Sequence, residues 1–127
     1  MERKSSKNKK ILGNSGETMA AQYLSQHGYK IVDRNFRFAN FGEIDIIARE
    51  NEYICFIEVK TRSGVSFGMP CESVNRKKQD NIKKLAYIYL KSHNLKNENI
   101  RFDIVEVLVS GPEPALVTEI NLIKNAF

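Results

Sequence analysis

Two short apolar runs, each interrupted by a carboxylate, constrain this chain more than any other feature. They cover residues 42–49 and 54–62 and are separated by the polar segment 50–52. Both runs are rich in β-branched and aromatic residues, which fit the pleated surface of a sheet, so together they predict a β-hairpin. Asp45 and Glu58 lie inside these runs. A carboxylate among apolar neighbours is costly unless it is paired, hydrogen-bonded or bound to a cation.

The alternation of side chains along a strand places a lysine beside these carboxylates. Side chains two residues apart share a face, so Glu58 and Lys60 point the same way, and the hairpin can bring Asp45 next to them. Carboxylate oxygens are the ligands that Mg²⁺ prefers in proteins. We therefore expect Asp45, Glu58 and the main-chain carbonyl of Val59 to hold Mg²⁺ or Mn²⁺. Lys60 would then stabilise the charge that develops on a phosphate.

An ordinary ion pair is the competing interpretation of this pattern. Pairs such as Lys60 with Glu58 or Asp45 are common on the solvent face of a sheet. Two further polar residues, Glu17 and Lys78, favour the metal site, because helical periodicity puts both on inward-facing stripes. Glu17 has an alternative role of its own, since a glutamate in the first turn of a helix stabilises the helix dipole.

The remaining pattern predicts two helices packed on a mixed sheet. Helical spacing covers residues 14–27 and a longer segment that starts at Cys71 or Glu72 and runs to about His93. Strand patterns cover residues 29–37, 100–109 and 115–123, in addition to the hairpin. The strand–helix–strand passage in the middle of the chain favours a mixed sheet. The loop 63–70, with two glycines and a proline, follows Lys60 and is a candidate rim of the site.

Length and composition indicate one globular domain. Of the 127 residues, 42% are hydrophobic and 28% are charged, which is ordinary for a globular protein. We expect residues 1–12 to form a flexible basic tail and residues 13–127 a single domain. No apolar run approaches the roughly 20 residues that span a bilayer, and the charged N-terminus does not resemble a secretory signal. The sequence therefore predicts a cytoplasmic protein without a membrane partner, in which Cys55 is a buried free thiol.

Positive charge is concentrated in two segments of a chain whose net charge is +5. Residues 1–10 carry five basic residues and one acid, and residues 72–96 carry seven basic residues and two acids. Such a distribution fits a polyanionic partner, although a charge run can also serve only to hydrate a surface. The candidates for nucleic-acid contact are Arg62, Arg76, Lys77, Lys78 and Gln79.

Several motifs resemble the YraN-like family of bacterial proteins. They are Gly13, Gly16-Glu17, Ala20, Tyr23-Leu24, Arg34-Asn35, Gly42-Glu43-Ile44-Asp45, Glu58-Val59-Lys60-Thr61-Arg62, Phe67-Gly68 and Lys78-Gln79. The resemblance continues to the closing residues 125–127, so it covers nearly the whole chain. This family looks like a branch of the PD-(D/E)XK nuclease superfamily, near its Holliday-junction-resolvase-like members.

The resemblance implies an α/β fold of the restriction-endonuclease-like type, with an α-β-β-β-α-β core and a central mixed sheet flanked by helices. It also implies a metal-binding and catalytic set, assisted by residues of the later helix. The Pro-Asp pair that opens the superfamily motif is absent, because Ile44 precedes Asp45. The substrate therefore cannot be carried over from the resemblance. The implied catalytic residues are Glu17, Asp45, Glu58 and Lys60, and the assisting residues are Lys78 and Gln79.

The leading hypothesis is an endonuclease that uses Mg²⁺ or Mn²⁺ to hydrolyse phosphodiester bonds of DNA, including branched DNA of recombination and repair. A second hypothesis is a non-catalytic nucleic-acid-binding or assembly protein that retains the nuclease fold. RNA processing is a third reading that the residues leave open. Because related resolvases act as symmetric dimers, the resemblance also makes a homodimer an expectation.

Overall fold

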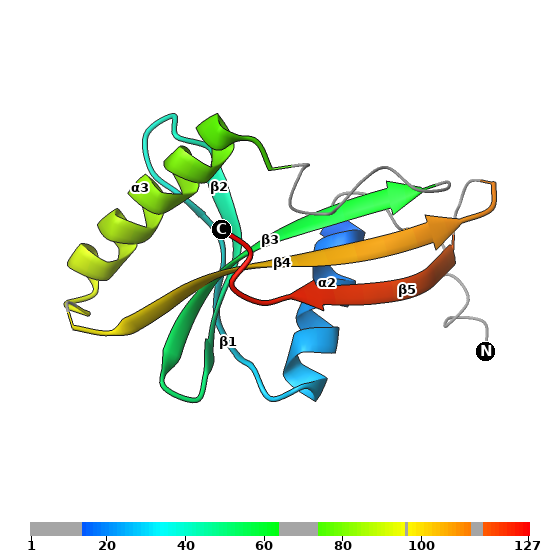
Figure 1. Cartoon of the computed structure of the whole chain (residues 1–127), viewed down its shortest axis with the longest axis horizontal. Helices are drawn as coiled ribbons and strands as arrows, with labels where there is room; N and C mark the ends of the chain where they lie inside the picture. Colours follow the sequence, from blue (N-terminus) through cyan, green and yellow to red (C-terminus); the bar gives the residue numbers. More distant parts are fainter. Residues whose placement is uncertain (1–13, 64–73, 96, 113–115) are drawn as a thin grey trace.

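Two helices and one five-stranded sheet make up the part of the chain that the computed structural model describes, residues 14–63, 74–95, 97–112 and 116–127. The predicted basic tail and nearly all of the predicted rim loop lie outside these residues. Figure 1 shows the elements in chain order. They are α2 (Asn14–Gln26), β1 (Lys30–Arg37), β2 (Glu43–Glu50), β3 (Tyr53–Ser63), α3 (Arg76–Ser92), β4 (Asn99–Ser110) and β5 (Leu116–Ile123).

The strands lie in the order β1-β2-β3-β4-β5. Strands β3 and β4 are parallel, with α3 connecting them, and the other neighbours are antiparallel. This arrangement confirms the predicted mixed sheet and the restriction-endonuclease-like α-β-β-β-α-β core, to which β5 adds an edge strand. The two-residue turn Asn51-Glu52 closes the predicted hairpin, and Asn51 takes the left-handed conformation (φ 55°) that such a turn requires.

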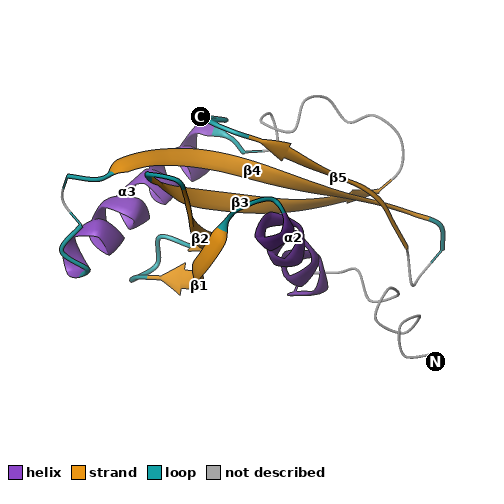
Figure 2. Ribbon diagram, turned by 90° about the horizontal axis from the view of Figure 1, so that it is seen from below, coloured by secondary structure: helices purple, strands orange, loops and turns teal. Residues whose placement is uncertain are grey.

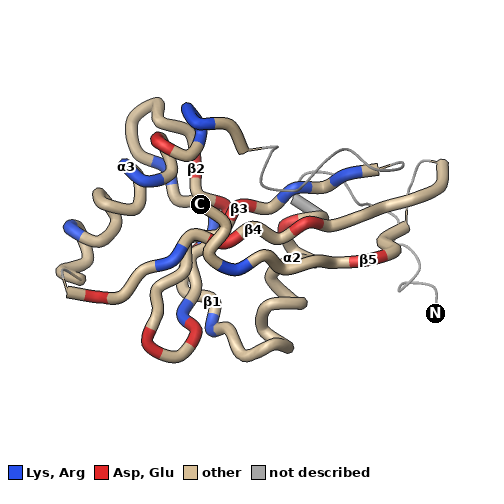
Figure 3. The backbone as a smooth tube through the Cα atoms, viewed as in Figure 1, with Lys and Arg blue, Asp and Glu red and all other residues tan. Residues whose placement is uncertain are grey.

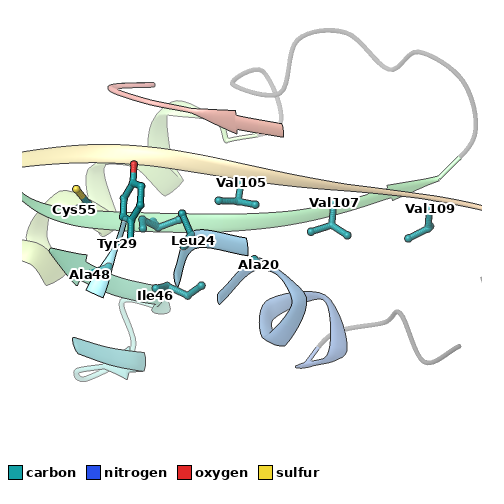
Figure 4. Close-up of a cluster of buried hydrophobic side chains, with 10 residues drawn as sticks. Ala20, Leu24, Tyr29, Ile46, Ala48, Cys55, Val105, Val107 and Val109 are labelled. Carbon is teal, nitrogen blue, oxygen red and sulfur yellow. The ribbon is translucent and has the colours of Figure 1, made fainter. Parts of the chain in front are cut away.

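Each face of the sheet buries its own helix. On one face, Ala20 and Leu24 of α2 pack against valines of β4 (Figure 4). On the other face, Ile82 and Leu85 of α3 pack against a cluster that includes Phe56. In Figure 1, β4 and β5 pass in front of α2, and Figure 2 gives the view at right angles. Each fully buried Leu or Ile side chain stabilises the fold by about 1.5–3 kcal/mol. Neither described helix is long and apolar enough to cross a membrane.

Helix α3 begins at Arg76, so the predicted start at Cys71 or Glu72 is wrong. The physical reason is an N-cap. Asn75 has an extended backbone, and its side-chain oxygen accepts a hydrogen bond from Lys78 N at 2.9 Å. The buried Val74, which the helical pattern includes, therefore packs from the segment before the helix.

The prediction for Cys55 is confirmed, and both histidines have contacts within the fold. Cys55 is a fully buried free thiol. Each histidine lies at a helix end, where its Nδ1 is hydrogen-bonded to the carbonyl oxygen four residues earlier: His27 to Tyr23 at 2.8 Å, and His93 to Tyr89 at 3.0 Å. Both imidazoles therefore have structural roles.

Strands β2 and β3 diverge beyond their common turn. Their ladder runs from the Glu50–Tyr53 pair to the Ile46–Ile57 pair and ends there. In Figure 1, the two strands start together at the hairpin and point in different directions at their other ends. The divergence leaves the next residues of both strands, Asp45 and Glu58, without partners in this ladder.

The start of α2 comes unusually close to β3. Gly16 is buried, and a Cβ atom at this position would lie inside contact distance of the Thr61 Oγ1 atom. The missing side chain thus sets how near α2 lies to the sheet, and Glu17 is the next residue along the helix.

We expect Gly16→Ala to lower the free energy of unfolding by about 1–3 kcal/mol. The steric clash of the added methyl group destabilises the fold by more than the higher helix propensity of alanine stabilises it. In a Thr61→Ala background, the same substitution should be neutral or stabilising by up to about 1 kcal/mol, because the obstructing hydroxyl is gone. Urea unfolding of all four members of this double-mutant cycle measures both effects. Equal effects of Gly16→Ala in the two backgrounds would refute the contact.

Candidate functional site

Asp45 occupies the point where β2 and β3 diverge. Its Oδ2 atom accepts a hydrogen bond of 2.8 Å from the main-chain N–H of Val59, which lies beyond the last paired residues of the ladder. The Asp45 side chain therefore replaces a strand–strand hydrogen bond. It is 7% exposed, so the chain buries this carboxylate at the edge of the opening.

Glu58 is the second buried carboxylate and has two lysines around it. Its Oε2 atom is 2.5 Å from Lys78 Nζ and 3.8 Å from Lys60 Nζ. Lys78 comes from α3, and Lys60 comes from the same strand as Glu58. The predicted neighbours Glu58 and Lys60 are thus brought together, as is the inward-facing Lys78. The ion pair of the competing interpretation is therefore present, with partly exposed lysines (25% and 41%) around a carboxylate that is only 4% exposed.

Glu17 reaches the same region from α2. Asn35 of β1, which has a left-handed backbone (φ 55°), donates hydrogen bonds to Glu17 Oε1 at 2.8 Å and to Glu43 Oε2 at 3.2 Å. Arg34 Nη2 lies 3.9 Å from Glu17 Oε1. The Arg34-Asn35 pair therefore holds Glu17 over the sheet.

Glu43 is a member of the site that sequence reasoning missed. One oxygen each of Glu17, Glu43 and Asp45 lie within 4.8 Å of one another, close enough to share a cation. The signal was present in the sequence, because Glu43 and Asp45 are two residues apart in a strand and share a face. Asn35 gave no comparable signal, since its contacts depend on an unusual backbone angle.

The surroundings of Asp45 raise the pKa of its carboxyl group far above the ordinary range. Burial raises its pKa from the ordinary 3.8 to about 9, and the charges of Glu58 and Glu17 and a hydrogen bond with Glu43 act in the same direction. The Val59 N–H lowers the pKa but is outweighed. For Glu43, burial raises the pKa, yet the hydrogen bonds with Asp45 and Arg37 outweigh it and the pKa falls. A protonated Asp45 thus donates to the Glu43 carboxylate.

The two lysines respond to their surroundings in opposite ways. Burial and the neighbouring charge of Lys78 lower the pKa of Lys60. Burial also acts to lower the pKa of Lys78, but its hydrogen bond and attraction to Glu58 outweigh that effect and raise the pKa. Of the two lysines, Lys78 therefore holds its positive charge to higher pH and is the main counter-charge of Glu58.

A buried carboxylate elsewhere in the chain shows what full neutralisation requires. Asp103 is completely buried and accepts hydrogen bonds from the Tyr29 hydroxyl at 3.1 Å, from Arg101 Nε at 3.0 Å and from the Asn125 N–H at 2.9 Å. Asp45, by contrast, has one main-chain donor and three carboxylates near it. This set of oxygen atoms has the chemistry that suits a hard divalent cation.

The predicted nucleic-acid contacts fall into two groups. Arg62 forms an ion pair of 2.6 Å with Glu106 and is 12% exposed, and Gln79 donates to the Val74 carbonyl at 2.9 Å. Both side chains thus have contacts within the fold. Lys77 lines a pocket beside the site together with Lys78, and Arg76 is 85% exposed on α3, 3.5 Å from Asp80.

The shifted pKa of Asp45 predicts a pH dependence of stability in metal-free protein. A carboxyl group whose pKa is higher in the folded chain contributes most below its unfolded value of 3.8, and that contribution is lost as the pH rises toward 9. Between these limits, the loss is up to about 1.4 kcal/mol per pH unit. We expect Asp45→Asn to remove most of this slope.

The measurement is the free energy of unfolding in urea with EDTA, from pH 5 to pH 8. Asp80→Asn is the matched control, because Asp80 is 54% exposed and should leave the slope unchanged. A wild-type slope that persists in Asp45→Asn would show that Asp45 is ionised in the folded protein.

Comparison with known proteins gives one consistent match. The model of uncharacterised protein family UPF0102 matches residues 16–107. A UPF0102 protein of Acetivibrio thermocellus is 49% identical over 121 residues, which are 94% of this chain and 93% of that protein. UPF0102 proteins of Caldicellulosiruptor bescii and Clostridium kluyveri are 49% and 48% identical over 94% and 93% of this chain, and over 99% and 94% of their own lengths. These names state no activity, so function has to be argued from the site.

Proposed function

The chain belongs to the UPF0102 family, the YraN-like group, and from the geometry of its site we propose that it is a metal-dependent endonuclease acting on DNA. One observation carries the proposal: two buried carboxylates, Asp45 and Glu58, lie where two strands diverge, with Lys60 and Lys78 beside them. Phosphodiester hydrolysis needs positive charge around the phosphate oxygens. This site offers two sources of it: the lysines themselves, and a divalent cation that the carboxylates are suited to bind.

Asp45 and Glu58 would hold Mg²⁺ or Mn²⁺, with Glu17 and Glu43 as further oxygen donors close to Asp45. When bound, such a cation stabilises negative charge on the phosphate and makes a water molecule more acidic. Lys60 is suited to stabilise the charge that develops in the transition state, because its partly buried ammonium group lies 3.8 Å from Glu58 at the proposed cation site. The Val59 N–H keeps the Asp45 carboxyl group in one orientation.

A non-catalytic nucleic-acid-binding protein is the second candidate. The Lys78–Glu58 ion pair of 2.5 Å favours it, because that pair neutralises Glu58 without a metal. Metal binding separates the two functions: a binding protein would take up nucleic acid in EDTA and show no Mn²⁺ binding. RNA as substrate, the homodimer and the cytoplasmic location stay predictions.

The nuclease proposal predicts cleavage of DNA that depends on Mg²⁺ or Mn²⁺. Glu58→Gln and Asp45→Asn should each lower the rate about 100-fold or more, because each removes charge from the proposed cation site. The assay is gel analysis of labelled branched, nicked, single-stranded and linear DNA, with an RNA of the same sequence alongside. Glu119→Gln, an exposed change on β5, should cleave like wild type. Cleavage that survives Glu58→Gln combined with Asp45→Asn would refute the assigned site.

The contribution of Glu43 can be measured without cleavage. We expect Glu43→Gln to weaken Mn²⁺ binding about 10- to 100-fold, because an oxygen of Glu43 lies close enough to oxygens of Glu17 and Asp45 for all three to bind one cation. Calorimetric or electron paramagnetic resonance titration of Mn²⁺ into Glu43→Gln, Glu58→Gln and Glu98→Gln gives the comparison. Glu98, the residue before β4, is the control and should bind like wild type. If Glu43→Gln also binds like wild type, the cation would be assigned to Asp45 and Glu58 alone.

A further inference from the structure

A surface of lysines and aromatic rings on α3 and the β1–β2 turn lies next to the acidic site. We propose that this surface binds an unpaired single strand of DNA and leads it to the site, an inference that rests on the proposed nuclease function because it names the form of the substrate. The strand-binding surface consists of Phe41, Lys77, Asn81, Lys83, Lys84 and Tyr87.

A pocket of about 310 Å³ connects this surface to the site. Its lining includes Glu43 and Lys78 of the site as well as Phe41, Asn81 and Ile82. Two of these residues belong to the acidic site, so a group in the pocket touches the site directly. The pocket offers apolar walls, an amide edge and a lysine, which is the combination that a flat base with polar edges requires.

A second pocket, of about 370 Å³, continues the surface along α3. It shares Phe41 with the first pocket and is otherwise lined by Lys83, Lys84, Tyr87 and Ile88. The Tyr87 side chain is 61% exposed although it is large and aromatic. The two pockets are therefore neighbours that share Phe41.

Aromatic rings and lysines alternate on this surface. Lys84 Nζ lies 5.4 Å from the centre of the Phe41 ring, and Lys91 Nζ lies 5.5 Å from the centre of the Tyr87 ring. Rings between cationic groups are typical of proteins that bind single strands, where bases stack on the rings and phosphates meet the cations. In a continuous duplex, the base faces are stacked on one another, so the exposed Tyr87 ring and the partly buried Phe41 ring would have nothing to stack on. This point favours an unpaired strand.

The charge and the length of the surface match such a strand. Helix α3 carries six basic residues and one acid, and Figure 3 shows basic residues along it. Lys77 and Lys84 are seven residues apart and lie on one side of α3, and seven residues at about 1.5 Å each give about 10.5 Å. That length accommodates roughly three stacked nucleotides at about 3.4 Å each. The surface is thus long enough to hold several nucleotides on one side of the cleavage position.

The experiment measures binding without cleavage, by fluorescence anisotropy of the full chain in EDTA. The probes are a labelled 15-nucleotide oligo(dT) and a labelled 15-base-pair duplex. We expect tighter binding of the single strand. Tyr87→Ala should weaken it about 5- to 100-fold, and Tyr87→Phe should retain the wild-type affinity, because stacking needs the ring and not the hydroxyl. Lys84→Ala should lower the slope of log K against log salt by about 0.7.

Lys30→Ala is the matched control for Lys84→Ala. Lys30 is exposed at the start of β1 and pairs with Arg49, which lies at the opposite end of β2 from Glu43. Removing the Lys30 side chain should therefore leave the salt slope unchanged. Wild-type affinity of Tyr87→Ala for oligo(dT), or equal affinity of the wild-type protein for duplex and single strand, would overturn the inference. Because Tyr87 is exposed, its truncation is not expected to unfold the chain, and the urea midpoint of Tyr87→Ala checks this.

Cleavage assays separate this inference from the nuclease proposal. Suppose that duplex DNA is cut, that Tyr87→Ala cuts it as fast as wild type, and that neither protein prefers unpaired strands. This result would support the nuclease proposal and refute the strand-binding surface. If oligo(dT) binds through Tyr87 but no DNA is cut with Mg²⁺ or Mn²⁺, the surface stands and the nuclease proposal falls.

Discussion

The hydrogen bond from the Val59 N–H to the Asp45 carboxyl group is the interaction on which the site depends. It stands at the end of the β2–β3 ladder, where a main-chain acceptor would otherwise continue the sheet. By accepting this N–H, Asp45 allows the strands to part without leaving a buried donor unpaired, which would cost about 1–3 kcal/mol. The opening that results is what lets side chains from both faces of the sheet come together. The Asp45 carboxyl group therefore lies both at the end of the β2–β3 pairing and in the candidate site.

The parted strands bring together two different electrostatic environments. On the side of α3, Glu58 has two lysines as counter-charges. On the side of α2, Glu17 and Glu43 surround Asp45, and the chain relieves the repulsion by leaving a proton on Asp45. This imbalance distinguishes the site from the Asp103 network, where donors satisfy the carboxylate completely. A network that is already satisfied has nothing to offer a ligand, whereas the protonated Asp45 marks a place where added positive charge would be stabilised.

The sequence predicts the fold well, and the site in part, for reasons that differ between residues. Period-two alternation with carboxylates inside it identifies the hairpin, Asp45, Glu58 and Lys60, because all of them depend on local spacing. Helical spacing identifies Glu17 and Lys78 as inward-facing, and both reach the site. Glu43 follows the same alternation and was overlooked. The role of Asn35 depends on a backbone angle, and the start of α3 depends on the capping bond of Asn75, so neither follows from hydrophobic periodicity.

The close approach of Gly16 to Thr61 has a consequence for how this sequence can change over evolutionary time. A side chain at position 16 needs the space that the Thr61 hydroxyl fills, and any outward shift of α2 would carry Glu17 away from Asn35. The two positions, 45 residues apart in the chain, are therefore not free to drift independently. Lineages that keep the acidic cluster should either retain the glycine or exchange both residues together. The position of Glu17 relative to the site should therefore couple residue choice in a helix to residue choice in a strand.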